Sequence, residues 1–332
     1  MPQIAVIIPC YNAASFIART VSYLQVQTMQ DFECFLVDDG STDNTYQLIS
    51  DIACSDHRFT ALTQHNSGPG PARNSALDHV SAPVIAFMDS DDAILPNHLQ
   101  LLLNGIEDVD LLFTSALYLN ATEPIPTTPA PIPDELLCTK DKNEIAQLIA
   151  RHPGRVVWAA AFRTDIIRKH HIIFPPYAYE DTFFVYRYLL HVSSLRLTNQ
   201  RSYCYIRYSN SITSSGRNYP DIQQVDDLAN LVNQLTAYLN LNPSLIQATR
   251  DFVLSRYRAS ITKPYHKDTY MPYCVRISRW NAVARNTNYK AAPKDCFHGK
   301  EYIFFLLIRT KLFYLFDPLL LVATRVLPPR ML

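Results

Sequence analysis

Short apolar runs alternate with amphipathic stretches through the first 120 residues of the chain. The apolar runs are rich in β-branched and aromatic residues, which is typical of strands. The expected strands span 4–9, 32–39, 59–64, 83–90 and 110–119. The expected helices lie between them, at about 14–28, 43–54 and 71–79. This is the spacing of βαβ units, so the pattern predicts an α/β fold with a mostly parallel central sheet flanked by helices.

The pattern changes after residue 120. Residues 120–135 contain five prolines, which fix φ and withhold N–H donors, so we expect an extended loop or lid there. A helix is expected at 141–151, an extended segment at 156–163, and a loop followed by a helix within 174–191. A long helical stretch is expected at about 220–285, which predicts a helical C-terminal extension.

The composition is that of a globular protein, since 48% of the 332 residues are hydrophobic and 18% are charged. The seven cysteines are scattered, with no C-x-x-C pair, which favours reduced thiols in a cytosolic setting over a disulfide framework. The N-terminal residues run directly into the first strand without the basic start of a signal peptide. We therefore expect a cytoplasmic protein.

Charge is distributed unevenly although the net charge is zero. Residues 1–250 carry 16 basic and 25 acidic residues, whereas residues 251–332 carry 14 basic and 5 acidic residues. A basic C-terminal region favours an anionic partner. No zinc-finger spacing or RNA-binding aromatic signature accompanies it, so we expect an anionic membrane surface and no nucleic acid.

The apolar runs at 302–308 and 312–323 are too short to span a membrane. Beside basic residues they predict peripheral attachment through the tail, and the alternative is a helix of the hydrophobic core.

Polar residues follow the expected strands at their carboxyl ends. Taken singly, these residues are typical helix caps and turns. In an open α/β sheet, however, ligands bind outside the carboxyl ends of the strands, so four such clusters on one edge predict a binding site. The clusters are Pro9-Cys10-Tyr11-Asn12, Asp38-Asp39-Gly40-Ser41, the loop from His65 to Gly70, and Asp89-Ser90-Asp91-Asp92.

The acidic cluster favours a divalent cation. In an extended segment, the side chains of Asp89 and Asp91 would point to the same side. Carboxylate oxygens suit Mg²⁺ or Mn²⁺, which keep some waters and bridge substrate phosphates. The chain lacks G-x-x-x-x-G-K-[ST] and G-x-G-x-x-G, which argues against a P-loop NTPase and a dinucleotide oxidoreductase.

Four ordered segments carry a specific resemblance: VIIPCYN, VDDGSTDNT, NSGPGPARNSAL and VIAFMDSDDAILPNHL. Together they resemble the inverting glycosyltransferases of family 2, with the GT-A fold and of the bacterial polysaccharide or glycan type. The likeness covers about residues 3–120. It continues more weakly through Trp158, the pair Glu180-Asp181 and residues 203–213.

The resemblance implies a role for each matching residue. Asp39 matches the residue that pairs with the base, usually uracil, and Asp181 matches the catalytic base. Asp91 and Asp89 match the D-x-D motif that holds Mn²⁺ or Mg²⁺. Trp158, Glu180 and Arg207 are candidates for acceptor contact or closure of the site. The donor-binding residues implied by the resemblance are Pro9, Tyr11, Asn12, Asp39, Gly68, Arg73 and Asp89.

These roles imply a metal-dependent inverting transfer from a nucleotide sugar, usually a UDP-sugar, to a hydroxyl of a glycan or lipid-linked acceptor, giving a β-linkage. Residues 1–215 would form the GT-A domain, with 1–120 binding the nucleotide sugar and 121–215 on the acceptor side. Residues 216–332 would form the helical C-terminal region with its basic, apolar tail. The enzyme would lie on the inner face of the cell membrane.

Several alternatives remain open at this level. Arg73 could be a solvent-facing helix residue, Trp158 could pack in the core, and Glu180-Asp181 could only cap a helix against its dipole. A non-catalytic nucleotide-sugar-binding subunit is disfavoured because Asp91 and Asp181 are both present. A nucleotidyltransferase is disfavoured because the first loop is not a basic, glycine-rich phosphate loop.

Overall fold

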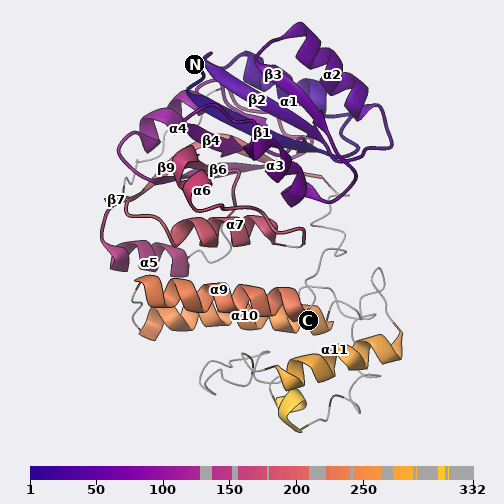
Figure 1. Cartoon of the computed structure of the whole chain (residues 1–332), viewed down its shortest axis with the longest axis vertical. Coiled ribbons are helices and arrows are strands. Elements are labelled where there is room, and N and C mark those ends of the chain that lie inside the picture. The colour runs from indigo at the N-terminus through magenta and orange to yellow at the C-terminus, as the bar shows by residue number, and fades with distance from the viewer. Residues whose placement is uncertain are drawn as a thin grey trace. The chain divides into compact units, whose positions relative to one another are not determined.

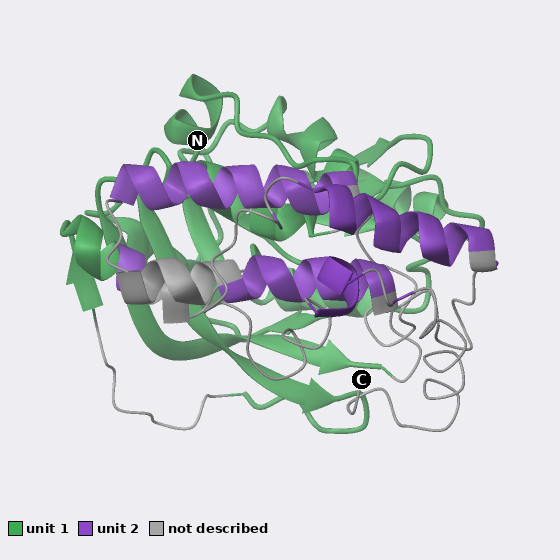
Figure 2. Cartoon of the chain, turned by 90° about the horizontal axis from the view of Figure 1, so that it is seen from below, with its two compact units in different colours: residues 1–145, 155–208 green, residues 146–154, 209–332 purple. Residues whose placement is uncertain are grey.

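The computed structural model describes residues 1–127, 137–151, 156–177, 179–208, 222–239, 243–262, 272–286, 289, 306–310 and 313. The chain forms two compact units (Figure 2). The first comprises residues 1–145 and 155–208, and the second comprises residues 146–154 and 209–332. The candidate site described below lies wholly within the first unit.

A mixed sheet forms the centre of the first unit (Figure 1). Its strand order is β3-β2-β1-β4-β8-β6-β9-β5, with β7 paired to β9. Six strands are parallel to one another, while β5, β7 and β8 run antiparallel to their neighbours. The strands are β1 (Ile4–Cys10), β2 (Phe32–Asp38), β3 (Phe59–Thr63), β4 (Val84–Phe87), β5 (Ala93–Ile94), β6 (Leu111–Asn120), β7 (Leu137–Thr139), β8 (Ala160–Arg163) and β9 (Leu195–Arg207).

Helices flank this sheet, as the βαβ spacing predicts. All seven residues of β1 are buried, because a parallel strand covered on both faces needs apolar side chains on both. The helices of residues 1–208 are α1 (Ile17–Gln25), α2 (Thr45–Ser55), α3 (Pro69–Leu77), α4 (His98–Ile106), α5 (Lys142–Arg151), α6 (Thr164–Lys169) and α7 (Glu180–Leu189). The predicted fold class is therefore confirmed.

The second unit contains α9 (Ile222–Leu239), α10 (Pro243–Thr262) and α11 (Tyr273–Arg285), together with the last residues of α5 and a helical segment at 306–310. The predicted helical stretch at about 220–285 is confirmed, and within the described residues it is divided into three helices. Asp226 Oδ1 accepts from the Tyr257 hydroxyl at 2.5 Å, and Asn286 Nδ2 donates to Asp226 Oδ2 at 2.6 Å. This polar cluster joins α9 to α10 and to the residue that ends α11.

The described helices bear on the membrane prediction only in part. None of them combines the length and the hydropathy that crossing a membrane requires. The predicted attachment segment, 300–332, lies outside the described residues except for 306–310 and 313.

The register of the parallel strands brings the candidate residues together. Cys10 at the end of β1 lies opposite Asp38 at the end of β2, and Ile7 of β1 lies opposite Phe87 at the end of β4. The loops that follow these strands therefore leave the sheet at one edge, where a doubly wound fold binds its ligands.

Candidate active site

The loops after β1 and β2 are bonded to each other. The Asn12 N–H donates to Ser41 Oγ at 2.9 Å, and Asn12 Oδ1 accepts from the Thr42 N–H at 2.9 Å. Asn12 adopts a left-handed conformation with φ of +49°, which Asn tolerates better than most residues. Pro9 lies buried within β1, whereas 48% of Tyr11 is exposed. The loop after β1 thus presents the exposed ring of Tyr11 at the edge of the sheet.

Asp39 holds the loop that precedes α3. It is buried, and its Oδ1 accepts from Gln64 Nε2 at 2.7 Å and from the Ser67 N–H at 2.9 Å. Its Oδ2 accepts from the Gly68 N–H at 2.8 Å. Gly68 has φ of +94°, a conformation that glycine adopts without a Cβ penalty. Asp39 therefore shapes the loop itself, a contact that sequence reasoning did not anticipate.

Arg73 joins two carboxylates from different elements. Its Nη1 donates to Glu180 Oε1 and its Nη2 donates to Asp89 Oδ1, both at 2.9 Å. The residue is only 4% exposed, and its guanidinium lies 5.3 Å from the centroid of the Phe174 ring. The alternative of a solvent-facing arginine is therefore wrong. Its Nε is buried and has no hydrogen-bond partner among the described residues.

The D-x-D segment forms a turn. β4 ends at Phe87, residues 90 and 91 form a turn, and the Asp92 N–H donates to the Asp89 carbonyl at 3.2 Å. The expectation of an extended Asp89-Ser90-Asp91 segment is therefore wrong. Burial, followed by the charge of Asp89, raises the pKa of Asp91 to about 6. The turn thus concentrates negative charge that a cation would neutralise.

Asp92 and Tyr203 fix this turn. The sequence placed Asp92 in the acidic cluster at the site but predicted this contact for neither residue. Asp92 is buried, its Oδ2 accepts from the Tyr203 hydroxyl at 2.6 Å, and its Oδ1 accepts from the Ile206 N–H at 2.8 Å. The same hydroxyl accepts from the Asp89 N–H at 3.1 Å. The available signals were a third acid in the DSDD run and a tyrosine in an apolar strand.

Asp181 stands in the first turn of α7, beside Glu180. Its Oδ1 accepts from the Thr182 N–H at 2.7 Å, and Tyr179, the residue before the helix, has φ of +64°. Burial, followed by the charge of Glu180, raises the pKa of Asp181 to about 7. A carboxylate with a pKa near neutrality can both accept and return a proton, which suits a general base.

Trp158 and Arg207 belong to an aromatic cluster. The indole of Trp158 stacks with the rings of Tyr203 and Tyr205 at centroid distances of 4.9 and 5.4 Å. Trp158 is only 9% exposed, so the geometry favours packing over stacking against a ligand. The guanidinium of Arg207 lies 5.3 Å from the centroid of the Tyr118 ring. Trp158 thus supports the strand that carries Tyr203.

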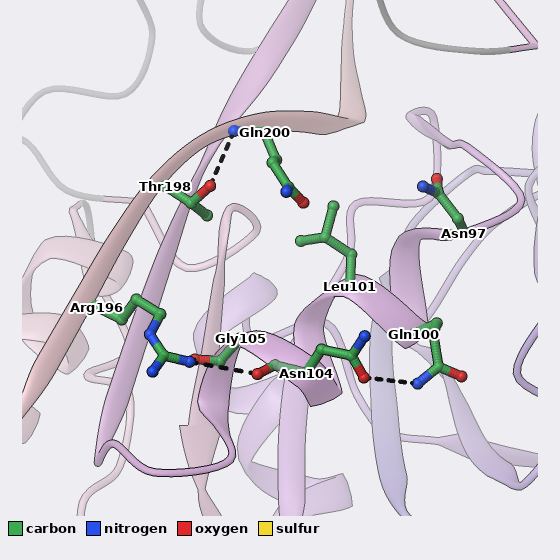
Figure 3. Close-up of a pocket in the computed structure, with 8 residues that line it drawn as sticks. All are labelled: Asn97, Gln100, Leu101, Asn104, Gly105, Arg196, Thr198 and Gln200. Atoms are coloured by element: carbon green, nitrogen blue, oxygen red, sulfur yellow. Dashed lines mark hydrogen bonds between the residues drawn. The ribbon is translucent and has the colours of Figure 1, made fainter. Parts of the chain in front are cut away.

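A pocket of about 310 Å³ lies between α4 and the first half of β9 (Figure 3). Four carboxamides are prominent in its lining, and none of the acidic residues described above contributes to it. It is lined by Asn97, Gln100, Leu101, Asn104, Gly105, Arg196, Thr198 and Gln200. The candidate site is therefore identified by its charges and contacts and not by this cavity.

Asp89 and Asp91 are the residues that fit a divalent cation. Among the described residues, no group of three or more His, Cys, Asp or Glu side chains could hold a metal. Mg²⁺ commonly needs only one or two carboxylates, because it keeps several waters and takes oxygens from substrate phosphates. Burial and the charge of Asp89 raise the pKa of Asp91, and a cation bound beside its carboxylate would offset both effects. The oxygen donors present are thus compatible with Mg²⁺ or Mn²⁺.

Comparisons with known proteins find relatives that are named as glycosyltransferases. EpsH of Bacillus subtilis, named as a glycosyltransferase, is 28% identical over 194 residues, covering 56% of this chain and 55% of EpsH. An uncharacterized glycosyltransferase of Haemophilus influenzae is 36% identical over 119 residues, which cover 36% of this chain and 48% of that protein. The chain thus spans about half the length of these relatives.

The fold is also similar to that of a solved structure. S. aureus TarS, in complex with UDP-GlcNAc, superposes with a TM-score of 0.69 at 19% identity, covering 93% of this chain and 88% of that one. Residues 5–169 match the family model described as glycosyl transferase family 2. The chain has a GT-A-type fold, and its residues 5–169 form a glycosyltransferase family 2 domain.

Proposed function

We propose that the protein transfers a sugar from a UDP-sugar to a hydroxyl of a glycan or lipid-linked acceptor, with inversion at the anomeric carbon and dependence on a divalent metal. The observation that carries the proposal is the contact of one buried arginine, Arg73, with both Asp89 of the D-x-D turn and Glu180, the neighbour of Asp181. Groups suited to the donor and to a general base are thus connected through a single side chain.

The donor would occupy the rim formed by the loops after β1 and β2 and by the loop before α3. Tyr11 and Asn12 would border the nucleotide, Asp39 would face the base, and Gly68 would let the backbone approach the ribose and diphosphate. TarS, which shares the fold, was solved with UDP-GlcNAc, so this compound is the first donor to test.

Asp89 and Asp91 would hold Mn²⁺ or Mg²⁺. When bound, such an ion neutralises charge on the diphosphate of the leaving nucleotide. A mannosyltransferase of Pyrobaculum calidifontis with a TM-score of 0.51 to this chain was solved with GDP-Man and Mn²⁺, which makes Mn²⁺ the first ion to test. Arg73 would add a second, permanent positive charge on the same side.

Asp181 would act as the general base. Its carboxylate would take the proton from the acceptor hydroxyl while that oxygen attacks the anomeric carbon from the face opposite the nucleotide. The bond from the anomeric carbon to the diphosphate oxygen breaks in the same step, and the diphosphate leaves with the electron pair. An α-linked donor then gives a β-glycoside, and no covalent intermediate on the protein is needed.

The acceptor side is inferred from the remaining sequence. The proline-rich segment 120–135, of which 128–135 lie outside the described residues, is expected to border the acceptor within a catalytic domain of residues 1–215. Residues 216–332, with their basic tail, would hold the enzyme on the anionic inner face of the cell membrane, where lipid-linked acceptors lie. Such attachment would be peripheral.

A donor screen tests the proposal. The full chain, purified with Mn²⁺ and separately with chelator, is incubated with a panel of UDP-sugars, and release of UDP is measured. We expect metal-dependent UDP release from at least one donor, faster with a glycan acceptor. Tight binding of a UDP-sugar without any release would instead favour a non-catalytic binding subunit. No binding of any UDP-sugar would contradict the proposal.

A further inference from the structure

We infer that Glu180 is a positioning residue, which orients the first turn of α7 by its bond to Arg73 and thereby directs Asp181 toward its proton. This inference rests on the proposed function and adds a residue to it. One buried guanidinium connects α7 with the turn after β4, because Arg73 donates at 2.9 Å both to Glu180 and to Asp89.

Uncharged hydrogen bonds hold Phe174, which precedes α7, against α3. Asn74 Nδ2 donates to the Phe174 carbonyl at 2.8 Å, and Asn74 Oδ1 accepts from the Phe174 N–H at 2.9 Å. A Cβ at Gly70 would lie 2.6 Å from the Pro175 carbonyl oxygen and 3.2 Å from Cβ of Glu180. Gly70 therefore permits a close approach of α3, which presents Arg73 to Glu180 at a defined place.

The bond between Arg73 and Glu180 constrains the neighbouring residue as well. Glu180 and Asp181 are the first two residues of α7, and a helix has a fixed rotation of 3.6 residues per turn. Holding the Glu180 side chain on Arg73 thus sets the rotation of the first turn about the helix axis. Two interactions then orient the Asp181 carboxylate: the bond of the neighbouring Glu180 to Arg73, and the hydrogen bond that Asp181 accepts from the Thr182 N–H at 2.7 Å.

The simpler role for Glu180 is a favourable interaction with the helix dipole. Any acid in a first turn provides that interaction, and α6 offers a matched case, because Asp165 stands in its first turn and is exposed. Asp165 is not among the residues that Arg73 contacts in the described structure. A dipole role therefore predicts a lower Tm with little change in kcat at both positions, whereas positioning predicts a loss of kcat at Glu180 alone.

The test compares Glu180→Ala, Glu180→Gln and Asp165→Ala in the full chain, with the best UDP-sugar from the donor screen. For each variant, kcat, the donor KM, the donor Kd and Tm are measured. We expect Glu180→Ala to lower kcat by up to about 10²-fold with the donor Kd near the wild-type value, since small displacements of a reacting group have effects of this order. Glu180→Gln should retain most of kcat, because an amide oxygen still accepts from Arg73 Nη1. Asp165→Ala should match the wild type.

A wild-type kcat in Glu180→Ala would overturn the inference. A kcat in Glu180→Gln as low as in Glu180→Ala would also overturn it, and so would an equal loss of kcat in Asp165→Ala. If Glu180→Ala has a much lower Tm, the comparison of Glu180→Gln with wild type decides, since that variant keeps the bond. A wild-type protein that releases UDP from no donor would contradict the proposed function instead, so the two failures are distinguishable.

Discussion

The hydroxyl of Tyr203 donates to Asp92 Oδ2 at 2.6 Å and accepts from the N–H of Asp89 at 3.1 Å. One side chain of β9 thus satisfies a buried carboxyl and fixes the backbone of the D-x-D turn. Burial, followed by the charge of Asp89, raises the pKa of Asp92 to about 8. The hydrogen bonds from Tyr203 and from the Ile206 N–H act in the opposite direction, because they stabilise the charged form of the carboxyl. The third acid of the DSDD run therefore stabilises the turn.

Tyr203→Phe should destabilise the protein. The change leaves Asp92 Oδ2 and the Asp89 N–H without this partner, and an unsatisfied buried group costs about 1–3 kcal/mol in the free energy of unfolding. Urea unfolding followed by circular dichroism measures the difference. Tyr118→Phe is the control, because Tyr118 is 58% exposed. Equal stability of Tyr203→Phe and wild type would show that the hydroxyl does not fix the turn.

Asp91→Asn should remove most transfer activity and weaken metal-dependent binding of UDP, while the fold survives. The fold should survive because burial and repulsion from Asp89 already disfavour the charged form of Asp91. Isothermal titration with UDP and Mn²⁺ measures the binding, and Asp108→Asn, at an exposed position, is the control. A variant that transfers sugar at the wild-type rate in the presence of chelator would contradict the D-x-D assignment.

Asp181→Asn should retain donor binding and lower turnover by about 10²–10⁴-fold, the usual contribution of a positioned general base. The asparagine side chain keeps the shape of the carboxyl and cannot take the proton. UDP-sugar binding by calorimetry and initial rates at saturating donor separate the two effects. If the variant instead loses donor binding, Asp181 belongs to the donor site.

The rate should also depend on pH through Asp181. A base must be deprotonated to act, and burial with the charge of Glu180 raises its pKa to about 7. The rate at saturating substrates should therefore fall as pH decreases through about 7 and level off above it. A pH–rate profile from about pH 5 to 9 measures this. A flat profile across that interval would contradict the assignment of Asp181 as the base.

The basic tail should bring the protein to anionic membranes. Each basic residue near an anionic surface contributes about 1 kcal/mol to binding, and salt screens this attraction. Flotation with anionic liposomes should carry the full chain at low salt and less of it at high salt. A chain that ends near residue 298 should not float. Equal flotation of both chains would assign the apolar runs of the tail to the core.

Local patterns predicted the sheet and the edge that carries the site. β1 is a continuous apolar run and β2 is mostly apolar apart from Glu33 and its final Asp38, and turn residues follow both within ten residues of sequence. The side-chain contacts at the site were not predictable in this way. Arg73 and Glu180 are 107 residues apart, and Tyr203 and Asp92 are 111 apart. Such pairs form only when the whole sheet is assembled.

The conformation of the D-x-D segment was also not predictable from the local sequence. Period-two reasoning treated Asp89-Ser90-Asp91 as a continuation of β4, but the chain turns after Phe87. The hydroxyl of Tyr203, from a strand far along the chain, holds the N–H of Asp89 in that turn. Tertiary contact therefore decided a local conformation that alternation alone misassigned.

The configuration of the product tests the central claim most directly. The product formed from the α-linked donor identified in the screen, with Mn²⁺ and acceptor, is examined by NMR at its anomeric proton. A single displacement assisted by Asp181 predicts a β-glycoside, and Asp181→Asn should form the same product far more slowly. An α-glycoside would require retention of configuration, and it would contradict the in-line mechanism and the role of Asp181 together.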